Sequence, residues 1–274
     1  MRWIHPAIVA LALCLAVPGS PARSGGAAQE KPSARAAAPL PCSCPDSPAY
    51  PARRCRQDAG GFSDRFSQQN PRWNWGETEG SGYHRLSGNG RTRAVELGIG
   101  PGGGPEESDS SFEERALLRR WGKCRFRIRC SGSNDDPGAG TMGWGVWRPG
   151  GAGDLDAVWF LSCSGASDPD LRGFQAMVIL QGAVVFQKTI AVDLTLWHDY
   201  GLEIAPAGAR FLVDGRAVAE SGPLPPELPC MKTVCWIDNK LVHMTKGRAS
   251  VVHGPAALGK SLWLSFAEFR PTSR

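Results

Sequence analysis

The chain has 274 residues, with 31 Lys and Arg against 26 Asp and Glu, 34 Gly and 22 Pro. Gly and Pro together make up about a fifth of the chain, above the roughly 12% of an average domain, and show no Gly-X-Y period. This composition excludes collagen and disfavours a helical bundle. The net charge of +5, without a run of five or more basic residues, is too small and too evenly spread to indicate a nucleic-acid partner.

The N-terminus has the layout of a secretory signal peptide. Met1-Arg2 precedes an apolar stretch, Trp3 to Val17, and small residues follow as far as Ala22. The apolar stretch is shorter than the roughly 20 residues of a membrane helix, and no later segment comes close. We therefore predict cleavage after residues 1–22, a secreted, extracellular protein and no membrane span.

Two segments are expected after the signal peptide. Residues 23–59 combine a flexible Ala- and Pro-rich spacer with a short cysteine-containing lead-in, Cys42 to Gln57. Residues 60–274 form the single folded domain.

Eight cysteines remain after cleavage, and an even number in an exported chain indicates disulfides. A zinc site is disfavoured because the spacings miss C-x₂₋₄-C pairs and no His lies at partner spacing, so no metal is predicted. Cys124 and Cys130 lie roughly 20 Å apart on one predicted strand and cannot pair with each other. Cys163 is the nearest candidate partner in sequence. The eight are Cys42, Cys44, Cys55, Cys124, Cys130, Cys163, Cys230 and Cys235.

From Gly60 onward, short apolar or alternating runs recur between turn residues, which is typical of an all-β domain. About eleven strands suit a large two-sheet antiparallel jelly-roll sandwich. One helical candidate, Glu106 to Arg120, competes with a polar excursion between strands. The predicted strands are Tyr83–Leu86, Arg93–Ile99, Cys124–Cys130, Met142–Trp147, Ala157–Ser162, Gln175–Leu180, Val184–Val192, His198–Ile204, Arg210–Val213, Thr233–Asp238 and Leu262–Phe269.

Several of these segments resemble a known superfamily. The stretch Leu196 to Ile204, followed by Gly208 to Gly215, resembles the W-H-x-Y and V-D-G hairpin of concanavalin A-like lectins and glucanases. Gly122 to Arg129 and Met142 to Trp147 resemble consecutive strands of laminarinase-type enzymes, glycoside hydrolase family sixteen. The resemblance spans roughly Phe62 to Phe269 and implies the fold, because the superfamily includes lectins, glucanases and adhesion modules.

The resemblance also locates a degenerate catalytic motif. Laminarinase-type enzymes carry E-x-D-x-(x)-E after the tryptophan strand, and the matching positions here are Asp154 for the nucleophile and Asp156 for the assisting carboxylate. The acid/base position falls on Val158 or Trp159, neither of which can transfer a proton. By chemistry alone, Asp154 and Asp156 lie roughly 6.6 Å apart on one strand face, near the spacing of a retaining glycosidase, but both would approach a sugar from one side. The alternative is that both are solvated beside a Gly-rich turn.

Sugar binding is predicted from tryptophans that share a face with acids, since indoles stack on pyranose rings while carboxylates accept from hydroxyls. The predicted contacts are Trp144, Asp154, Asp156, Trp236 and Asp238. Trp159 is assigned to a buried strand face with Leu155, Ala157 and Leu161, and Trp197 and Trp263 are assigned to the core.

No cofactor is predicted. Asp238 and Asn239 offer only two of the six to eight oxygens that Ca²⁺ requires. We predict a secreted carbohydrate-binding module without catalysis, with a polysaccharide partner. The alternatives are a laminarinase-type glycoside hydrolase acting on β-glucan or galactan with a relocated acid, such as Glu77 or Glu79, and a non-catalytic adhesion module.

Overall fold

The computed structural model describes residues 60–75, 78–101, 108–115, 121–131, 140–148, 155–164, 172–245, 248–253 and 259–272, without the side chains of Arg91, Ser164 and residues 241–253. The predicted signal peptide, the spacer and the cysteine-containing lead-in lie outside these ranges. No helix within the described ranges is long and apolar enough to cross a membrane.

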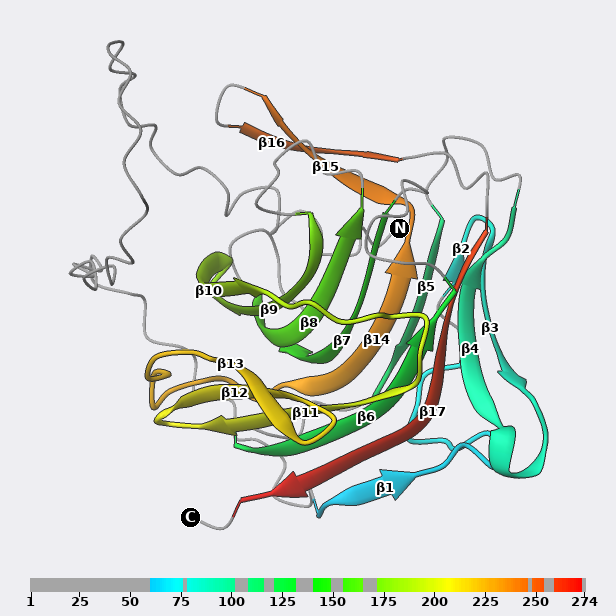
Figure 1. The fold of residues 1–274 in the computed structure, drawn as a ribbon, viewed down its shortest axis with the longest axis horizontal. Helices are drawn as coiled ribbons and strands as arrows, with labels where there is room; N and C mark the ends of the chain where they lie inside the picture. The colour runs from blue at the N-terminus through cyan, green and yellow to red at the C-terminus, as the bar shows by residue number, and fades with distance from the viewer. Residues whose placement is uncertain are drawn as a thin grey trace.

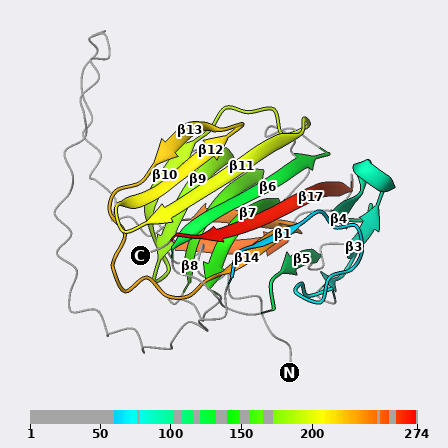
Figure 2. The same ribbon diagram turned by 90° about the horizontal axis from the view of Figure 1, so that it is seen from below.

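Two antiparallel sheets packed face to face form the body of the domain, which confirms the predicted jelly-roll sandwich (Figure 1). Figure 2 shows the larger sheet from its outer side. Its spatial order is β13 (Arg216–Glu220), β12 (Gly208–Val213), β11 (His198–Ala205), β6 (Gly122–Cys130), β17 (Lys260–Pro271), β4 (Ala94–Ile99) and β3 (Gly82–Ser87), and β1 (Phe62–Asp64) also pairs with β17.

The second sheet has seven strands, and a separate two-stranded hairpin completes the fold. The seven strands run in the order β10 (Ala183–Thr189), β9 (Gly173–Leu180), β8 (Asp156–Ser164), β7 (Gly140–Arg148), β14 (Lys232–Asp238), β5 (Asp109–Glu113) and β2 (Thr78–Glu79). The hairpin pairs β15 (Lys240–Thr245) with β16 (Arg248–His253), and a 3₁₀ turn, η1 (Gly90–Thr92), joins β3 to β4.

All eleven predicted strands are present, because each carries enough apolar or alternating residues to identify it. Of the two alternatives for Glu106 to Arg120, the helix is wrong over the described residues 108–115: Asp109–Glu113 forms β5, which pairs with β14 and β2. Phe112 of β5 is buried and stacks on Trp73, with ring centroids 4.8 Å apart. Strand pairing and this burial override a helix propensity that had only a narrow apolar stripe behind it.

Aromatic rings from the two sheets meet in the core. Trp144 of β7 lies 4.6 Å from Tyr200 of β11, and Phe160 of β8 lies 5.3 Å from Phe211 of β12. Such pairs each contribute about 0.5–1.5 kcal/mol beyond the burial of apolar area. These contacts fix which side of each strand faces inward, and therefore which side is left for function.

Four cysteines correct the disulfide prediction. Cys124, Cys130, Cys163 and Cys235 are buried and are not in disulfides, so none of them forms the predicted bridges. Burial raises the pKa of Cys130 and of Cys163 to about 12, which keeps these thiols protonated and unreactive. Cys230 is not one of these four, and the three remaining cysteines lie outside the described residues.

Candidate functional site

The outward face of the seven-stranded sheet, which points away from the core, is apolar along β7, β8 and β9. On β8 this face carries Ala157, Trp159, Leu161 and Cys163, which form a second buried cluster separate from the core between the sheets. Trp159 therefore shares a buried face with Leu155, Ala157 and Leu161 as predicted, but that face is turned away from the main core.

Two tryptophans meet on this face. The rings of Trp159 on β8 and Trp236 on β14 have centroids 4.7 Å apart and planes tilted by 50°. Gly143 of β7 lies under the Trp236 ring: a Cβ at this position would come within 2.3 Å of Trp236 Cη2. Because Gly143 has no side chain, the Trp236 indole can pack against the backbone of β7, where it remains partly exposed.

The Trp159 indole offers an unused donor. Trp159 is buried, and its Nε1 atom has no hydrogen-bond partner among the described residues. A buried N–H without an acceptor costs about 1–3 kcal/mol, and at this depth a ligand on the face would meet Trp236 first. This donor was missed from sequence, where Trp159 read only as an apolar residue.

A polar group adjoins the tryptophans along the same face. Trp147 Nε1 donates to Glu113 Oε2 at 3.0 Å, and the Lys232 ammonium pairs with the other oxygen of Glu113. The Lys232 ammonium also lies 5.8 Å from the centre of the Trp147 ring. Glu113 is thus held on both oxygens, and its charge is balanced. Neither Glu113 nor Lys232 was predicted, because β5 was not recognised as a strand.

Asp156, one of the predicted catalytic pair, lies at the start of β8 and is engaged within the fold. It is 0% exposed, accepts from the Gln181 N–H at 3.0 Å, and forms an ion pair with Arg148 at 2.8 Å. By strand alternation it lies on the opposite side of β8 from Trp159. Asp154, its predicted partner, lies outside the described residues.

The prediction that Trp144 contacts a glycan is wrong. The residue is fully buried in the core, packed against Phe174 and Tyr200, and so cannot contact a glycan on the sheet surface. The physical reason is register: Trp144 and Trp147 are an odd number of residues apart, so their side chains point to opposite faces of β7.

Asp238 shares a face with Trp236 as predicted, but it is 0% exposed. Thr141 links the two, since its hydroxyl accepts from Trp236 Nε1 at 3.0 Å and donates to the Asp238 carboxylate at 2.9 Å. The N–H groups of Thr141 and Lys240 also donate to Asp238. Burial raises the pKa of Asp238 to about 6, against the opposing charge of Lys240 and with a further rise from Asp109. Asp238 supports Trp236 rather than contacting a ligand itself.

The two residues considered as calcium ligands, Asp238 and Asn239, accept hydrogen bonds from protein groups. The Asp238 oxygens accept from Thr141 and Lys240, and Asn239 Oδ1 accepts from the Ser108 N–H at 2.9 Å. Among the residues whose positions are described, no group of three or more His, Cys, Asp or Glu could hold a metal ion.

The carboxyl groups described on this face do not form a hydrolytic pair. A glycosidase needs one carboxylic acid and one carboxylate on either side of the scissile bond, about 5–9.5 Å apart. Asp109 and Asp238 lie in register on β5 and β14, but both are buried, and the Lys240 ammonium lies 3.4 Å from Asp109. On β8, the described outward positions carry no carboxylate. This arrangement can stack a sugar on Trp236. Glu79 of β2, one of the two acids considered as a relocated acid, is exposed and lies in register with Asp109, but the other carboxylates described on this face are buried. Glu77 lies outside the described residues.

Comparisons with known proteins bear on the fold. No family model matches the chain, and no curated protein matches it in sequence. A Crh5 transglycosylase has 11% identity and a TM-score of 0.53 over 78% of this chain and 85% of that chain. A glycosidic hydrolase has 14% identity and a TM-score of 0.52 over 78% of this chain and 97% of that chain.

A third similar structure is an immunostimulatory antigen and pseudo β-1,3-glucanase of Mycobacterium tuberculosis. It has 12% identity and a TM-score of 0.51 over 77% of this chain and 98% of that chain. At these identities the likeness establishes the fold alone. The chain therefore shares the two-sheet jelly-roll fold of these three structures.

Proposed function

We propose that this protein is a secreted carbohydrate-binding module that holds a polysaccharide on the outward face of the seven-stranded sheet without cleaving it. The observation that carries the proposal is the Trp159–Trp236 pair, in which a partly exposed indole lies against a buried one. A pyranose ring stacks on an indole through its C–H face, and Trp236 offers that face while the buried Trp159 ring packs against it.

The absence of catalysis is proposed on the chemistry of β8. The resemblance places the catalytic acids at Asp154, at Asp156 and at Val158 or Trp159, whereas the described outward positions of β8 carry Ala157, Trp159 and Leu161, none of which can exchange a proton. Asp156 faces the other way and is paired with Arg148. A similar fold in Mycobacterium tuberculosis is itself described as a pseudo β-1,3-glucanase, which supports the proposal.

The test is retention and cleavage on a panel of laminarin, mixed-linkage β-glucan and galactan. We expect the wild-type protein to be retained in affinity electrophoresis on at least one of them and to release no reducing ends. Trp236→Ala should weaken retention at least about ten-fold, which corresponds to about 1.4 kcal/mol. The matched control is Trp263→Ala, which removes a half-buried tryptophan from the opposite sheet.

Three results would contradict the proposal. Reducing-end release by the wild-type protein would establish an enzyme, and an absence of retention across the panel would favour the adhesion module. Equal weakening by Trp236→Ala and Trp263→Ala would show that the tryptophan pair is not the site.

A further inference from the structure

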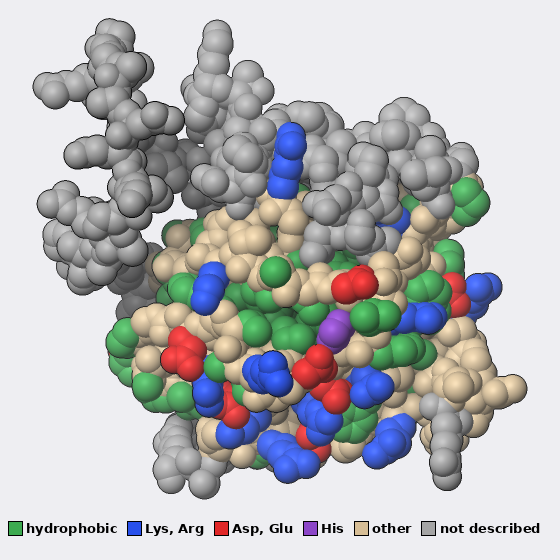
Figure 3. All heavy atoms as spheres, in the orientation of Figure 1, with side chains coloured by type: hydrophobic (Ala, Val, Ile, Leu, Met, Phe, Trp, Pro, Cys, Tyr) green, Lys and Arg blue, Asp and Glu red, His purple; other side chains and the backbone are tan. Residues whose placement is uncertain are grey.

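The outward face of the eight-stranded sheet carries a row of cations along β6. Lys123, Arg125, Arg127 and Arg129 alternate with four side chains that point into the core. Successive cations on one face of a strand are roughly 6.6 Å apart. Arg125 and Arg127 are well exposed, at 54% and 48% of their side-chain areas. In Figure 3, charged side chains gather in the lower part of the view, where Figure 1 draws β6, β11, β12 and β17.

Aromatic rings hold three guanidinium groups in place around this row. Arg129 lies between Trp197 and Trp263, at 5.3 and 4.6 Å from the ring centres. Arg125 and Arg65 each lie 5.7 Å from the centre of the Phe266 ring. Stacking orients a guanidinium plane while its N–H edges stay available for an anion. Trp197 and Trp263 were predicted to lie in the core, and the structure instead uses them to frame Arg129.

A β-bulge puts Phe266 on this face. The register of β17 against β6 shifts between Leu264 and Phe266, so that Ser265 is the extra residue. Trp263 before the bulge and Glu268 after it both point outward, although in a regular strand residues five positions apart would point to opposite faces. Without the bulge Phe266 would point into the core with Leu264. Bulges are common where a strand re-aims a side chain for function.

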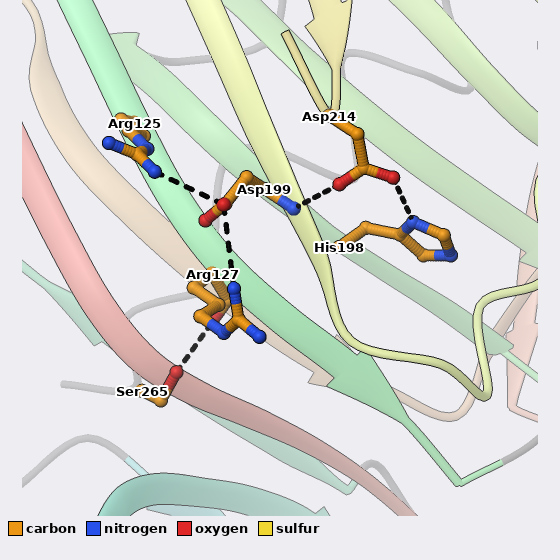
Figure 4. Close-up of polar contacts among 6 residues, drawn as sticks. All are labelled: Arg125, Arg127, His198, Asp199, Asp214 and Ser265. Atoms are coloured by element: carbon orange, nitrogen blue, oxygen red, sulfur yellow. Dashed lines mark hydrogen bonds and ion pairs between the residues drawn. The ribbon is translucent and has the colours of Figure 1, made fainter. Parts of the chain in front are cut away.

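The acids on this face neutralise the Lys123 end of the row and leave the Arg129 end with a net positive charge. At the other end Lys123 pairs with Glu203 at 2.7 Å and Arg270 with Glu268 at 2.8 Å. Arg125 and Arg127 share the single carboxylate of Asp199, at 3.1 and 3.4 Å (Figure 4). Within the described part of the chain, neither Arg65 nor Arg129 has an ion pair, and Arg129 Nε has no hydrogen-bond partner.

Asp199 shows how a carboxylate fits between these arginines. Its backbone N–H donates to Asp214 Oδ1 at 2.9 Å, and the second oxygen of Asp214 lies 2.7 Å from His198 Nδ1 (Figure 4). Asp199 is therefore held beside Arg125 and Arg127 by its backbone hydrogen bond as well as by its charge. A second carboxylate or a sulfate beside Arg127 and Arg129 would meet the same kind of guanidinium edges, and Asp199 would compete with it at Arg127.

A hollow adjoins the row. It has a volume of about 530 Å³ and adjoins the end of the row at which the cations are paired with acids. Its charged lining consists of Lys123, Arg125 and Arg270 with the carboxylates of Asp199, Glu203, Asp214 and Glu268. Gly201 leaves the centre of this surface without a side chain, and Leu212 provides an apolar floor beside it. The hollow offers a recessed, partly apolar surface next to fixed guanidinium groups.

We propose that this face binds an acidic polysaccharide, bearing carboxylate or sulfate groups, through Arg65, Arg125, Arg127 and Arg129. Planar guanidinium forks match carboxylate and sulfate geometry, and a row of them matches an extended chain with repeated charges. Nucleic acid fits less well. The described aromatic rings of the row are stacked on guanidinium groups rather than free for bases, and a sheet face has no helix or ribbon to enter a groove.

This second surface is independent of the tryptophan pair on the opposite sheet. The experiment uses the full chain and immobilised dextran sulfate, hyaluronan and uncharged dextran. We expect retention on at least one of the charged polymers and none on dextran. Arg127→Gln and Arg65→Gln should each weaken binding about ten-fold and lower the dependence of affinity on salt, because each removes one anion contact.

Three further variants localise the effect. Arg216→Gln removes an equal charge from an exposed position on β13 and should change binding less than two-fold. Asp199→Asn removes the competing carboxylate and should strengthen binding several-fold. Arg127→Lys keeps the charge but loses the fork, so its affinity should fall between those of wild type and Arg127→Gln. Thermal unfolding of each variant separates lost binding from lost folding.

The proposal is overturned if Arg216→Gln weakens binding as much as Arg127→Gln, since the attraction would then be unlocalised. It is also overturned if neither charged polymer is retained, or if single-stranded DNA of matched length binds equally well. Trp236→Ala should leave this binding unchanged, so a failed tryptophan site and a failed arginine row give different results.

Discussion

The outward faces of the two sheets carry opposite chemistry. Over β7, β8 and β9 the seven-stranded sheet presents a buried apolar cluster with two tryptophans in contact, whereas the eight-stranded sheet presents exposed arginines, acids and a hollow. The difference can be seen by comparing β8 with β6. β8 is apolar on both sides, and β6 alternates strictly between buried and exposed residues. Only β6 therefore behaves as a strand with one solvated face.

The largest contrast is expected in stability. Leu161→Ala, on the outward face of β8, removes a 2% exposed side chain and should lower the free energy of unfolding by about 2–5 kcal/mol. Leu212→Ala, on the outward face of β12, removes a half-buried side chain and should cost about 1 kcal/mol or less. Urea titration of both variants measures this difference. Equal losses would mean that the apolar face of β8 is not a second core.

Substitution of one glycine on each sheet should give a stability difference of intermediate size. A Cβ at Gly143 would lie 2.6 Å from the Phe160 carbonyl oxygen and 2.3 Å from the Trp236 ring, whereas at Gly201 the nearest atom is in the Leu212 side chain at 3.3 Å. Gly143→Ala should cost about 1–3 kcal/mol and displace Trp236, and Gly201→Ala should fold almost normally. Tryptophan fluorescence and urea titration report both effects. A normal emission spectrum for Gly143→Ala would contradict the close packing of Trp236.

The smallest expected difference is in how Asp238 and Asp214, one on each sheet side of the molecule, make stability depend on pH. Burial raises the pKa of Asp238 to about 6 from its ordinary 3.8, so the folded state holds this proton more tightly than the unfolded state. Asp238 should therefore make the protein less stable as pH rises from about 4 to about 6, and Asp238→Asn should remove that fall.

Asp214 should show the opposite sign. Burial opposes the shift, but the Asp199 N–H and His198 lower the pKa of Asp214, so its contribution is present above pH 4 and is lost as pH falls further. Unfolding midpoints of wild type, Asp238→Asn and Asp214→Asn between pH 3 and 7 check both signs. Identical curves for wild type and Asp238→Asn between pH 4 and 6 would contradict the buried, destabilised carboxylate.

Part of the candidate site was predictable from the sequence. Trp236 and Asp238 were placed on one face by the two-residue period, and the structure joins them through Thr141. The prediction for Trp144 was wrong because the two-residue period indicates which residues share a strand face but not which face points into the core. Glu113 and Lys232 were missed because β5 is short and polar, and only pairing with β14 makes it a strand.

The sequence alone determined an all-β domain, the positions of its eleven clearest strands and the alternation that separates the cations of β6 from its buried neighbours. Those are local properties of propensity and period. The tertiary structure decided which face of each strand meets the core, that a bulge turns Phe266 outward to Arg125, and that Trp197 and Trp263 come together around Arg129. Such outcomes depend on register between strands far apart in the chain, where a shift of one residue reverses every side chain.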